Sequence, residues 1–182
     1  MSVLEVVNYG NPILRKKCSQ VTDFSKLSAI IDDMFDTMYE EEGIGLAANQ
    51  VGVDMNLFII DISHADDYEF PRIFINGEIT SSRGESVFSE GCLSIPEIAL
   101  EVARPEVILF KYQDIHEKWH KEEFDGLLAR AIQHEIDHLN GVLIIDLVSE
   151  MQRLKINKEV KRIKNDSMTK LKQQSIIKGF VL

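Results

Sequence analysis

The feature that most constrains this chain is the segment QHEIDHLNG, in which two histidines stand four positions apart. On an α-helix, residues i and i+4 point to the same side, so His134 and His138 can bind one metal ion from a single face. Glu135 lies about 100° further round the helix, beside the ion, where it could serve as a general base on activated water. The flanking residues are mostly apolar, and burying these three polar groups without partners would be costly. The segment therefore predicts a buried helix at 126–139 that carries part of a metal site.

A metal site on this helix needs a third protein ligand, and the sequence leaves several candidates. One group of zinc endopeptidases places a third histidine at the position of Ile144, whose side chain cannot bind a metal. Glu150 or Glu159 could act from a second helix, although Glu159 lies in the basic stretch KEVKRIKN, which is typical of a solvated helix face. Cys18 lies in the charged stretch RKKCSQ and is expected to be an exposed thiol without a function.

The remaining candidate is Cys92, within EGCLSIPE. Gly91 permits a tight backbone and Pro96 restricts φ, so a stiff turn would present the thiol. A cysteine here could equally be a small buried hydrophobe. If Cys92 binds the ion, a Cys–His–His set with one open position matches a known kind of catalytic zinc site.

The rest of the chain predicts an α+β fold, with mostly antiparallel strands packed around the central metal-binding helix and a further helix near the C-terminus. Runs rich in Ile, Phe and Val predict strands at 56–62 and 72–79, and a pair within 101–113 that Pro105 interrupts. Another strand is expected near 118–124. The stretch GIGLAANQVG is expected to be a glycine-punctuated loop.

The helix ends carry recognisable signals. These are Ser25 or Asp23 before a helix at 25–40, Asp125 before and Gly141 after the helix at 126–139, and a Ser149–Gln152 capping box before a last helix at about 150–165.

Composition and charge narrow the class of protein. A chain of 182 residues, 45% hydrophobic and 27% charged, predicts one globular domain over 1–182. No apolar run is long enough for a membrane span, and no secretory pattern opens the chain, so a cytoplasmic location is expected. The net charge is −10, yet 151–182 contains nine lysines and arginines against two acidic residues. This basic helical segment, 149–182, could contact RNA or could simply be a solvated face.

Three stretches, GIGLAANQVG, EGCLSIP and QHEIDHLNG, resemble the signature motifs of bacterial peptide deformylases, in that family's order. NPILR near the start and the continuous block DGLLARAIQHEIDHLNGVLIIDLVS agree, so the resemblance covers about residues 1–150. It implies a single catalytic domain that hydrolyses the N-formyl group from the N-terminal formylmethionine of newly made polypeptides and releases formate.

The resemblance also implies a role for each motif residue. The expected metal ligands are Cys92, His134 and His138. Glu135 is expected to act as general base and acid, with the Gln50 side chain and the Leu93 N–H as oxyanion donors. The expected substrate-binding residues are Ile44, Gly45 and Leu127. The family uses Fe²⁺ natively, and Zn²⁺, Ni²⁺ or Co²⁺ could replace it in purified protein. The expected partners are nascent N-formylmethionyl peptides and, through the basic C-terminal segment, the ribosome; no membrane or DNA partner is expected.

Some features leave other interpretations open. Gly43-x-Gly45-x-x-Ala48 fits a loose dinucleotide fingerprint, but a helix precedes it where that fingerprint needs a strand. A peptidase that cuts internal bonds and a non-enzymatic metal-binding module are the rival functions.

Arg130 stands where deformylases often have an apolar residue, and it is expected to reach solvent at the pocket mouth or to alter side-chain preference. Glu90 and Arg104 are expected to pair and brace the cysteine loop.

Overall fold

The computed structural model describes residues 2–67 and 69–179, and its strands form two antiparallel sheets. The larger sheet has the order β1-β2-β3-β6-β7, with β1 at Gly45–Ala47, β2 at Leu57–Ile60, β3 at Arg72–Arg83, β6 at Val107–Gln113 and β7 at Trp119–Phe124. The smaller sheet is a hairpin of β4, Ser86–Gly91, and β5, Ala99–Arg104. The predicted α+β class is confirmed.

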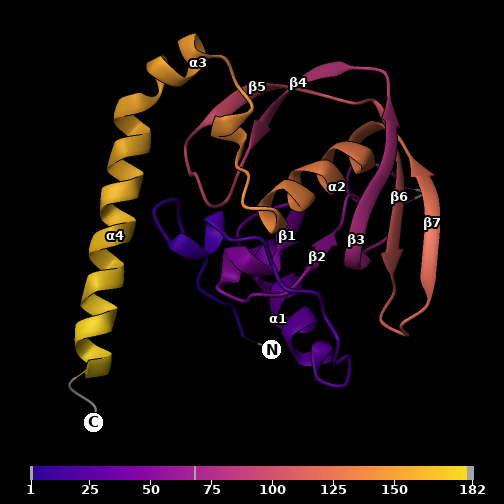
Figure 1. Ribbon diagram of the computed structural model, residues 1–182, viewed down its shortest axis with the longest axis horizontal. Helices are drawn as coiled ribbons and strands as arrows, with labels where there is room; N and C mark the ends of the chain where they lie inside the picture. The colour runs from indigo at the N-terminus through magenta and orange to yellow at the C-terminus, as the bar shows by residue number, and fades with distance from the viewer. Residues whose placement is uncertain (1, 68, 180–182) are drawn as a thin grey trace.

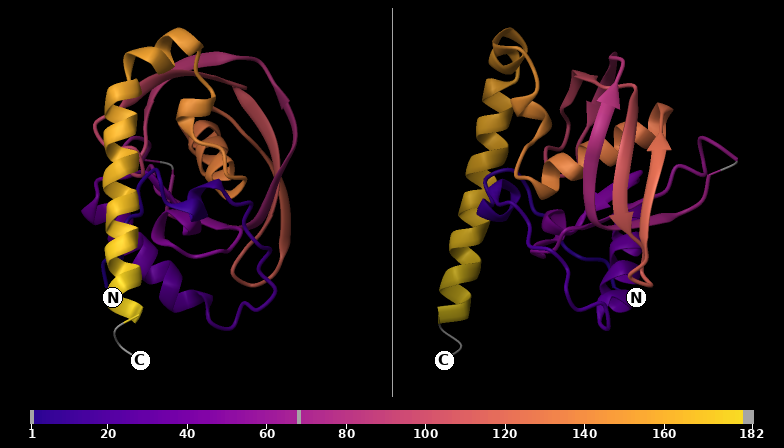
Figure 2. Two further views of the ribbon diagram at one scale, coloured as in Figure 1. Left: turned by 60° about the vertical axis from the view of Figure 1, so that its left-hand side comes forward. Right: turned by 45° about the vertical axis from the view of Figure 1, so that its right-hand side comes forward.

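The helices surround and fill these sheets. The α-helices are α1 (Leu27–Glu40), α2 (Gly126–Leu139), α3 (Glu150–Lys155) and α4 (Asn157–Gly179), and the short 3-10 helices are η1 (Pro12–Arg15), η2 (Ala48–Val51) and η3 (Ile144–Asp146). Helix α2 lies at the centre, between the larger sheet and the β4–β5 hairpin, while α4 runs along the outer side (Figures 1 and 2). No helix among the described residues is both long and apolar enough to cross a bilayer.

Aromatic side chains on the inner face of the larger sheet hold α2 in place. Burial alternates along β6, so that Phe110 and Tyr112 face inward together with Phe74 from β3. The rings of Phe58 and Phe74 stack with their centroids 4.9 Å apart. Ile132 of α2 is fully buried against this cluster. The apolar side of α2 is thereby fixed on the sheet, and its polar side faces the β4–β5 hairpin.

Several predicted element boundaries differ from those in the structure. The predicted cap of α1 is wrong: Asp23 Oδ1 accepts from the N–H and hydroxyl of Ser25, which closes a turn before the helix, and the helix itself starts after Lys26 without a side-chain cap. The stretch GIGLAANQVG is not a plain loop, because its middle pairs with β2 as β1 and then forms η2. The break at Pro105 is confirmed, although the strands on either side belong to different sheets.

The last helix, predicted at about 150–165, extends further in the structure and is divided in two. The Ser149–Gln152 capping box is confirmed at the start of α3, but the helix breaks at Ile156 and α4 continues to Gly179. Ile163 of α4 packs in one cluster with Ile95, close to the cysteine turn. These contacts hold the inner side of α4 against the body. The basic residues of α4 from Lys158 to Lys172 are exposed.

Candidate metal centre and active site

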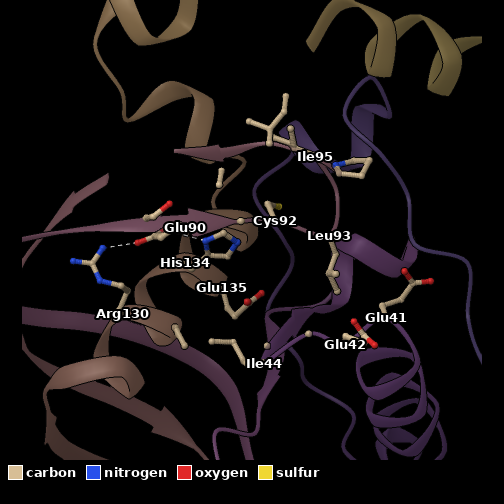
Figure 3. A pocket seen from close by; sticks show the side chains of 18 of the residues that line it. Glu41, Glu42, Ile44, Glu90, Cys92, Leu93, Ile95, Arg130, His134 and Glu135 are labelled. Atoms are coloured by element: carbon tan, nitrogen blue, oxygen red, sulfur yellow. Dashed lines mark hydrogen bonds and ion pairs between the residues drawn. The ribbon is translucent and has the colours of Figure 1, made fainter. Parts of the chain in front are cut away.

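The candidate metal ligands converge from two elements. One ligand atom each from Cys92, His134 and His138 lies within 4.8 Å of the others. The Cys92 Sγ atom is 3.2 Å from His138 Nε2. Both histidines stand on α2, whereas the cysteine stands in the turn after β4, and Figure 3 shows Cys92 above the His134 ring. The other candidate ligands are not brought here, since Glu150 on α3 and Glu159 on α4 are both exposed. Ile144 is buried in the core cluster against which Cys92 also packs.

The ends of α2 place its histidines. Asp125 precedes the helix as predicted, but its side chain makes no capping hydrogen bond. At the other end Gly141 adopts φ +76°, in the left-handed region that favours glycine. A β-carbon there would lie 2.7 Å from the backbone oxygen of Arg15. The helix therefore ends at a position that only glycine fills without displacing η1.

The turn that carries Cys92 is held on both sides. The N–H of Ile95 donates to the Cys92 carbonyl at 2.9 Å and closes the turn. The Ser94 carbonyl accepts the N–H of Tyr9 at 2.8 Å. Ile95 is fully buried. The thiol is thus presented by an ordered turn, as the glycine and proline around it indicate.

A buried carboxylate, Glu90, links this turn to α2. Its Oε1 accepts from Arg104 Nε at 2.7 Å and Arg130 Nη1 at 2.6 Å, and its Oε2 accepts from Arg104 Nη2 at 3.0 Å and His134 Nδ1 at 3.1 Å. Burial would raise the pKa of Glu90, but hydrogen bonds from His134 and Arg104 lower that pKa to about 2. The expected Glu90–Arg104 pair is confirmed. The expectation that Arg130 reaches solvent is wrong, because its guanidinium is buried in this ion-pair network. An effect of Arg130 on side-chain preference stays a prediction.

The donor set fits a divalent transition-metal ion. Because Nδ1 of His134 is hydrogen-bonded to Glu90, the other ring nitrogen of His134, Nε2, is free to bind a metal ion. Burial would lower the pKa of His134, but Cys92 and Glu90 raise it well above the ordinary value, so this position attracts positive charge. Burial and the repulsion from His134 lower the pKa of His138, which keeps that imidazole neutral as a ligand must be. One thiolate and two imidazoles suit zinc or ferrous iron.

Glu135 stands beside the three candidate ligands. It is 4% exposed, and its Oε2 has no hydrogen-bond partner within the described residues. Burial raises the pKa of this carboxyl to about 7. Such a group can take up and give back a proton near neutral pH. A buried carboxylate oxygen without a protein partner also indicates that water or substrate binds here.

Gln50 and Leu93 supply two further hydrogen-bond donors, and both residues line the same cavity as Glu135. Gln50 is fully buried; its Oε1 accepts the N–H of Ala47 at 2.8 Å, and its Nε2 lies 3.3 Å from Ser94 Oγ and 4.0 Å from Cys92 Sγ. The amide carries two N–H groups, and the one that faces Cys92 Sγ makes only a long contact, so it is the one available to a ligand. In the part of the chain that the structure describes, the Leu93 N–H donates to no other protein group.

These groups open into a cavity of about 650 Å³. Its walls include every predicted substrate-binding residue, namely Ile44, Gly45 and Leu127. Leu127 is 37% exposed, and Figure 3 shows the acidic residues Glu41 and Glu42 on the opposite side of the cavity from Arg130.

Sequence reasoning missed two residues that hold the site. Asn49 donates through Nδ2 to the carbonyl of His138 at 2.6 Å, and Ser94 accepts from Gln50. Asn49 adjoins Gln50 within GIGLAANQVG, so its place in that motif was the available signal. Cys18, predicted as exposed, is 6% exposed, and burial raises the pKa of its thiol to about 11. The expected exposure of Cys18 is therefore wrong, and its thiol is packed in the core.

Comparisons with known proteins identify the fold and the family. The family model of polypeptide deformylase matches residues 3–154. A peptide deformylase of Afipia carboxidovorans is 43% identical over 161 residues, covering 87% of this chain and 94% of the relative. That of Brucella suis is 42% identical and covers 93% of this chain and 98% of the relative.

Solved structures agree with these sequence matches. The crystal structure of a peptide deformylase from Legionella pneumophila superposes with a TM-score of 0.82 at 39% identity, covering 90% of this chain and 96% of that one. The structure from Thermotoga maritima gives a TM-score of 0.77 at 42% identity, covering 82% of this chain and 99% of that one. The chain belongs to the polypeptide deformylase family, metal-dependent hydrolases that remove the N-formyl group from nascent peptides.

Proposed function

We propose that this chain hydrolyses the formyl group of N-terminal formylmethionine through the residues gathered in the cavity. One observation carries the proposal: Cys92, His134 and His138 converge beside the Glu135 carboxylate, whose Oε2 has no hydrogen-bond partner among the described residues. A divalent ion held by these three side chains, Fe²⁺ natively and Zn²⁺, Ni²⁺ or Co²⁺ in purified protein, would supply a Lewis acid that lowers the pKa of water.

Glu135 is the proposed proton carrier. It takes a proton from the attacking water, whose oxygen bonds to the formyl carbon. When the bond from that carbon to the amide nitrogen breaks, Glu135 gives the proton to the leaving amine, and formate and the free N-terminus result. Burial of the carboxyl, with its pKa near 7, supports both transfers at neutral pH.

The proposed oxyanion donors are the Gln50 amide and the Leu93 N–H. Negative charge develops on the formyl oxygen during attack, and a fixed donor in a dry site typically contributes about 3 kcal/mol. The hydrogen bonds of Gln50 to Ala47 and Ser94 hold its amide in place before substrate arrives. Such preorganisation is what makes a donor effective.

The proposed substrate contacts are those of a peptide lying along β1. The Gly45 backbone would bind the peptide chain, and the side chains of Ile44 and Leu127 would line the pocket for methionine. An unbranched thioether fits an aliphatic pocket well. All three residues line the cavity that also contains Glu135.

The test is formate release from a formyl-Met tripeptide by anaerobically purified protein. Release should stop after chelation and return with Fe²⁺ or Ni²⁺. Cys92→Ser should lose metal, whereas Glu135→Gln should keep metal and lose activity. An unformylated peptide, followed by mass spectrometry, should remain uncut, whereas cleavage of an internal bond would favour the rival peptidase. No release from fully metallated protein would overturn the proposal.

The basic C-terminal segment, 149–182, is proposed to contact the ribosome, from which formylated chains emerge in the cytoplasm. Lys161 and Lys164 are exposed on α4, while Ile163 between them packs inward. Replacing both lysines by glutamate should therefore reduce co-sedimentation with ribosomes without unfolding α4. Lys121→Glu, on β7, is the matched control. Unchanged pelleting of the double variant would end this part of the proposal.

We also propose that residues 1–182 form one catalytic domain. The Ser167 hydroxyl of α4 donates to the Asn8 carbonyl at 3.0 Å, and Ile163 shares a core cluster with Ile95. The N-terminal segment around Asn8 and the part of α4 from Ile163 to Ser167 are thus packed on the same body.

A further inference from the structure

Arg130 is buried on α2, one helical turn before the first candidate histidine, and its guanidinium contacts both strands of the β4–β5 hairpin. Nη1 donates to Glu90 Oε1 at 2.6 Å and to the Val102 carbonyl at 3.1 Å. Nη2 donates to the carbonyl of Ser86 at 2.9 Å and to its hydroxyl at 2.8 Å. The ring centroid of Phe88 is 5.7 Å from the guanidinium carbon. Figure 3 shows Arg130 reaching Glu90 from α2.

These contacts connect the two elements that carry the candidate ligands. Ser86 begins β4, Val102 lies on β5, and Arg130 belongs to α2. Strand β4 passes through Glu90 into the turn that presents Cys92. A planar guanidinium donates in fixed directions, so it holds several partners in one geometry better than a flexible cation does. The separation between the thiol and the α2 histidines therefore depends on this side chain.

The same contacts help to orient the imidazole ring of His134. Glu90 accepts from His134 Nδ1, and a carboxylate in this position fixes the ring and its tautomer. His138 has no equivalent support, since its Nδ1 is buried without a hydrogen-bond partner among the described residues. Glu90 is thus the side chain that orients an imidazole in this site. Arg130 and Arg104 together hold Glu90.

We propose that Arg130 is a positioning residue for the metal centre. It holds Glu90 against His134 and the β4–β5 hairpin against α2, so that Cys92 meets the two histidines at the spacing an ion requires. This inference rests on the proposed metal site. It assigns a role to Arg130, which was expected from the sequence to reach solvent at the pocket mouth or to alter side-chain preference.

The probe is Co²⁺ alone, added to metal-free protein, with affinity and the visible absorption spectrum as readouts. Wild type must first bind Co²⁺ with thiolate and imidazole bands; if it does not, the proposed metal site itself fails. Arg130→Met should bind Co²⁺ at least about tenfold more weakly and with shifted bands, as the loss of a group behind a metal ligand typically does. Once saturated with metal, its kcat should fall while KM for the formyl peptide changes little.

A matched control and a second variant separate positioning from general destabilisation. Arg83→Met removes an exposed Arg83–Glu123 ion pair, with contacts of 2.6 and 2.7 Å, and should leave the Co²⁺ affinity and spectrum unchanged. In a Glu90→Gln background, Arg130→Met should weaken Co²⁺ binding much less than in wild type, because residues that act through one network are not additive.

Two results would overturn the inference. One is wild-type Co²⁺ affinity and spectrum in Arg130→Met; the other is full, independent losses in the double variant. If Arg130→Met does not fold, Arg130→Lys replaces it. A lysine offers three N–H donors on one nitrogen, fewer than the four acceptor atoms that the two guanidinium nitrogens of Arg130 hold. A loss of roughly threefold or more in Co²⁺ affinity therefore supports the role, and an unchanged value overturns it.

Discussion

Gly45 lies so close to Glu135 that a β-carbon at the glycine would be 2.6 Å from the carboxylate Oε1 atom. The backbone of β1 and the proposed proton carrier are therefore in direct contact, and glycine is what leaves room for the carboxylate. Gly45 was expected from sequence as a substrate-binding residue. The structure adds that its missing side chain also sets where Glu135 stands.

Replacing Gly45 by alanine should displace Glu135 and lower kcat. A shift of about 1 Å in a reacting group can reduce the rate on the order of 100-fold, so a loss of that size is expected. The measurement is formate release at saturating metal, with metal content and thermal stability recorded alongside. A variant that keeps wild-type kcat would show that Glu135 is not the group whose position matters.

Replacing Gln50 by alanine should remove a proposed oxyanion donor. Since that donor acts on charge that develops only during attack, kcat is expected to fall by about 100- to 1,000-fold while KM changes little. The check is steady-state kinetics on a formyl-Met peptide, with Co²⁺ affinity measured on the same sample. A rise in KM at constant kcat would assign Gln50 to ground-state binding instead.

The ion pair between Arg15 and Asp146 should make stability depend on acid pH. Burial opposes ionisation of Asp146, but hydrogen bonds from Arg15 and the Leu143 N–H lower its pKa below the ordinary value. A carboxyl whose pKa is lower in the folded state stabilises the fold above its unfolded pKa and loses that contribution as pH falls through its folded pKa.

Asp146→Asn should therefore cost about 1 kcal/mol of unfolding free energy at pH 7. The difference from wild type should shrink as the pH falls below about 4, the ordinary aspartate value. Urea unfolding of both proteins across this range tests the prediction. A difference that stayed constant down to pH 2 would mean that the carboxylate charge is not the cause.

Truncating Ile163 to alanine should loosen α4 from the cysteine turn. Its side chain is 4% exposed in the cluster that contains Ile95, and truncation of a buried isoleucine typically costs about 2–5 kcal/mol. Lys161→Ala, two residues away and exposed, should change stability by less than about 0.5 kcal/mol. Equal thermal midpoints for the two variants would contradict the assigned packing.

Sequence reasoning performed well where the signal was local. The bounds of α2 were predicted from Asp125 and Gly141, and the structure has the helix at Gly126–Leu139, although the Asp125 side chain makes no capping hydrogen bond. The Ser149–Gln152 capping box was likewise read from four consecutive residues. It failed at the cap of α1, where Asp23 had a competing local partner in Ser25. It also failed to place β4, whose exposed, mixed composition carries no strand pattern.

What the sequence by itself determined is the set of chemical groups and their local spacing: two histidines on one helical face, a glutamate beside them, and a cysteine in a stiff turn. Only the tertiary structure decided that Cys92 Sγ lies 3.2 Å from His138, that Cys18 is buried, and that Arg130 turns inward to Glu90. The physical reason is range. Helix periodicity and turn chemistry act over a few residues, whereas burial and ion pairing depend on which distant segments the folded core brings together.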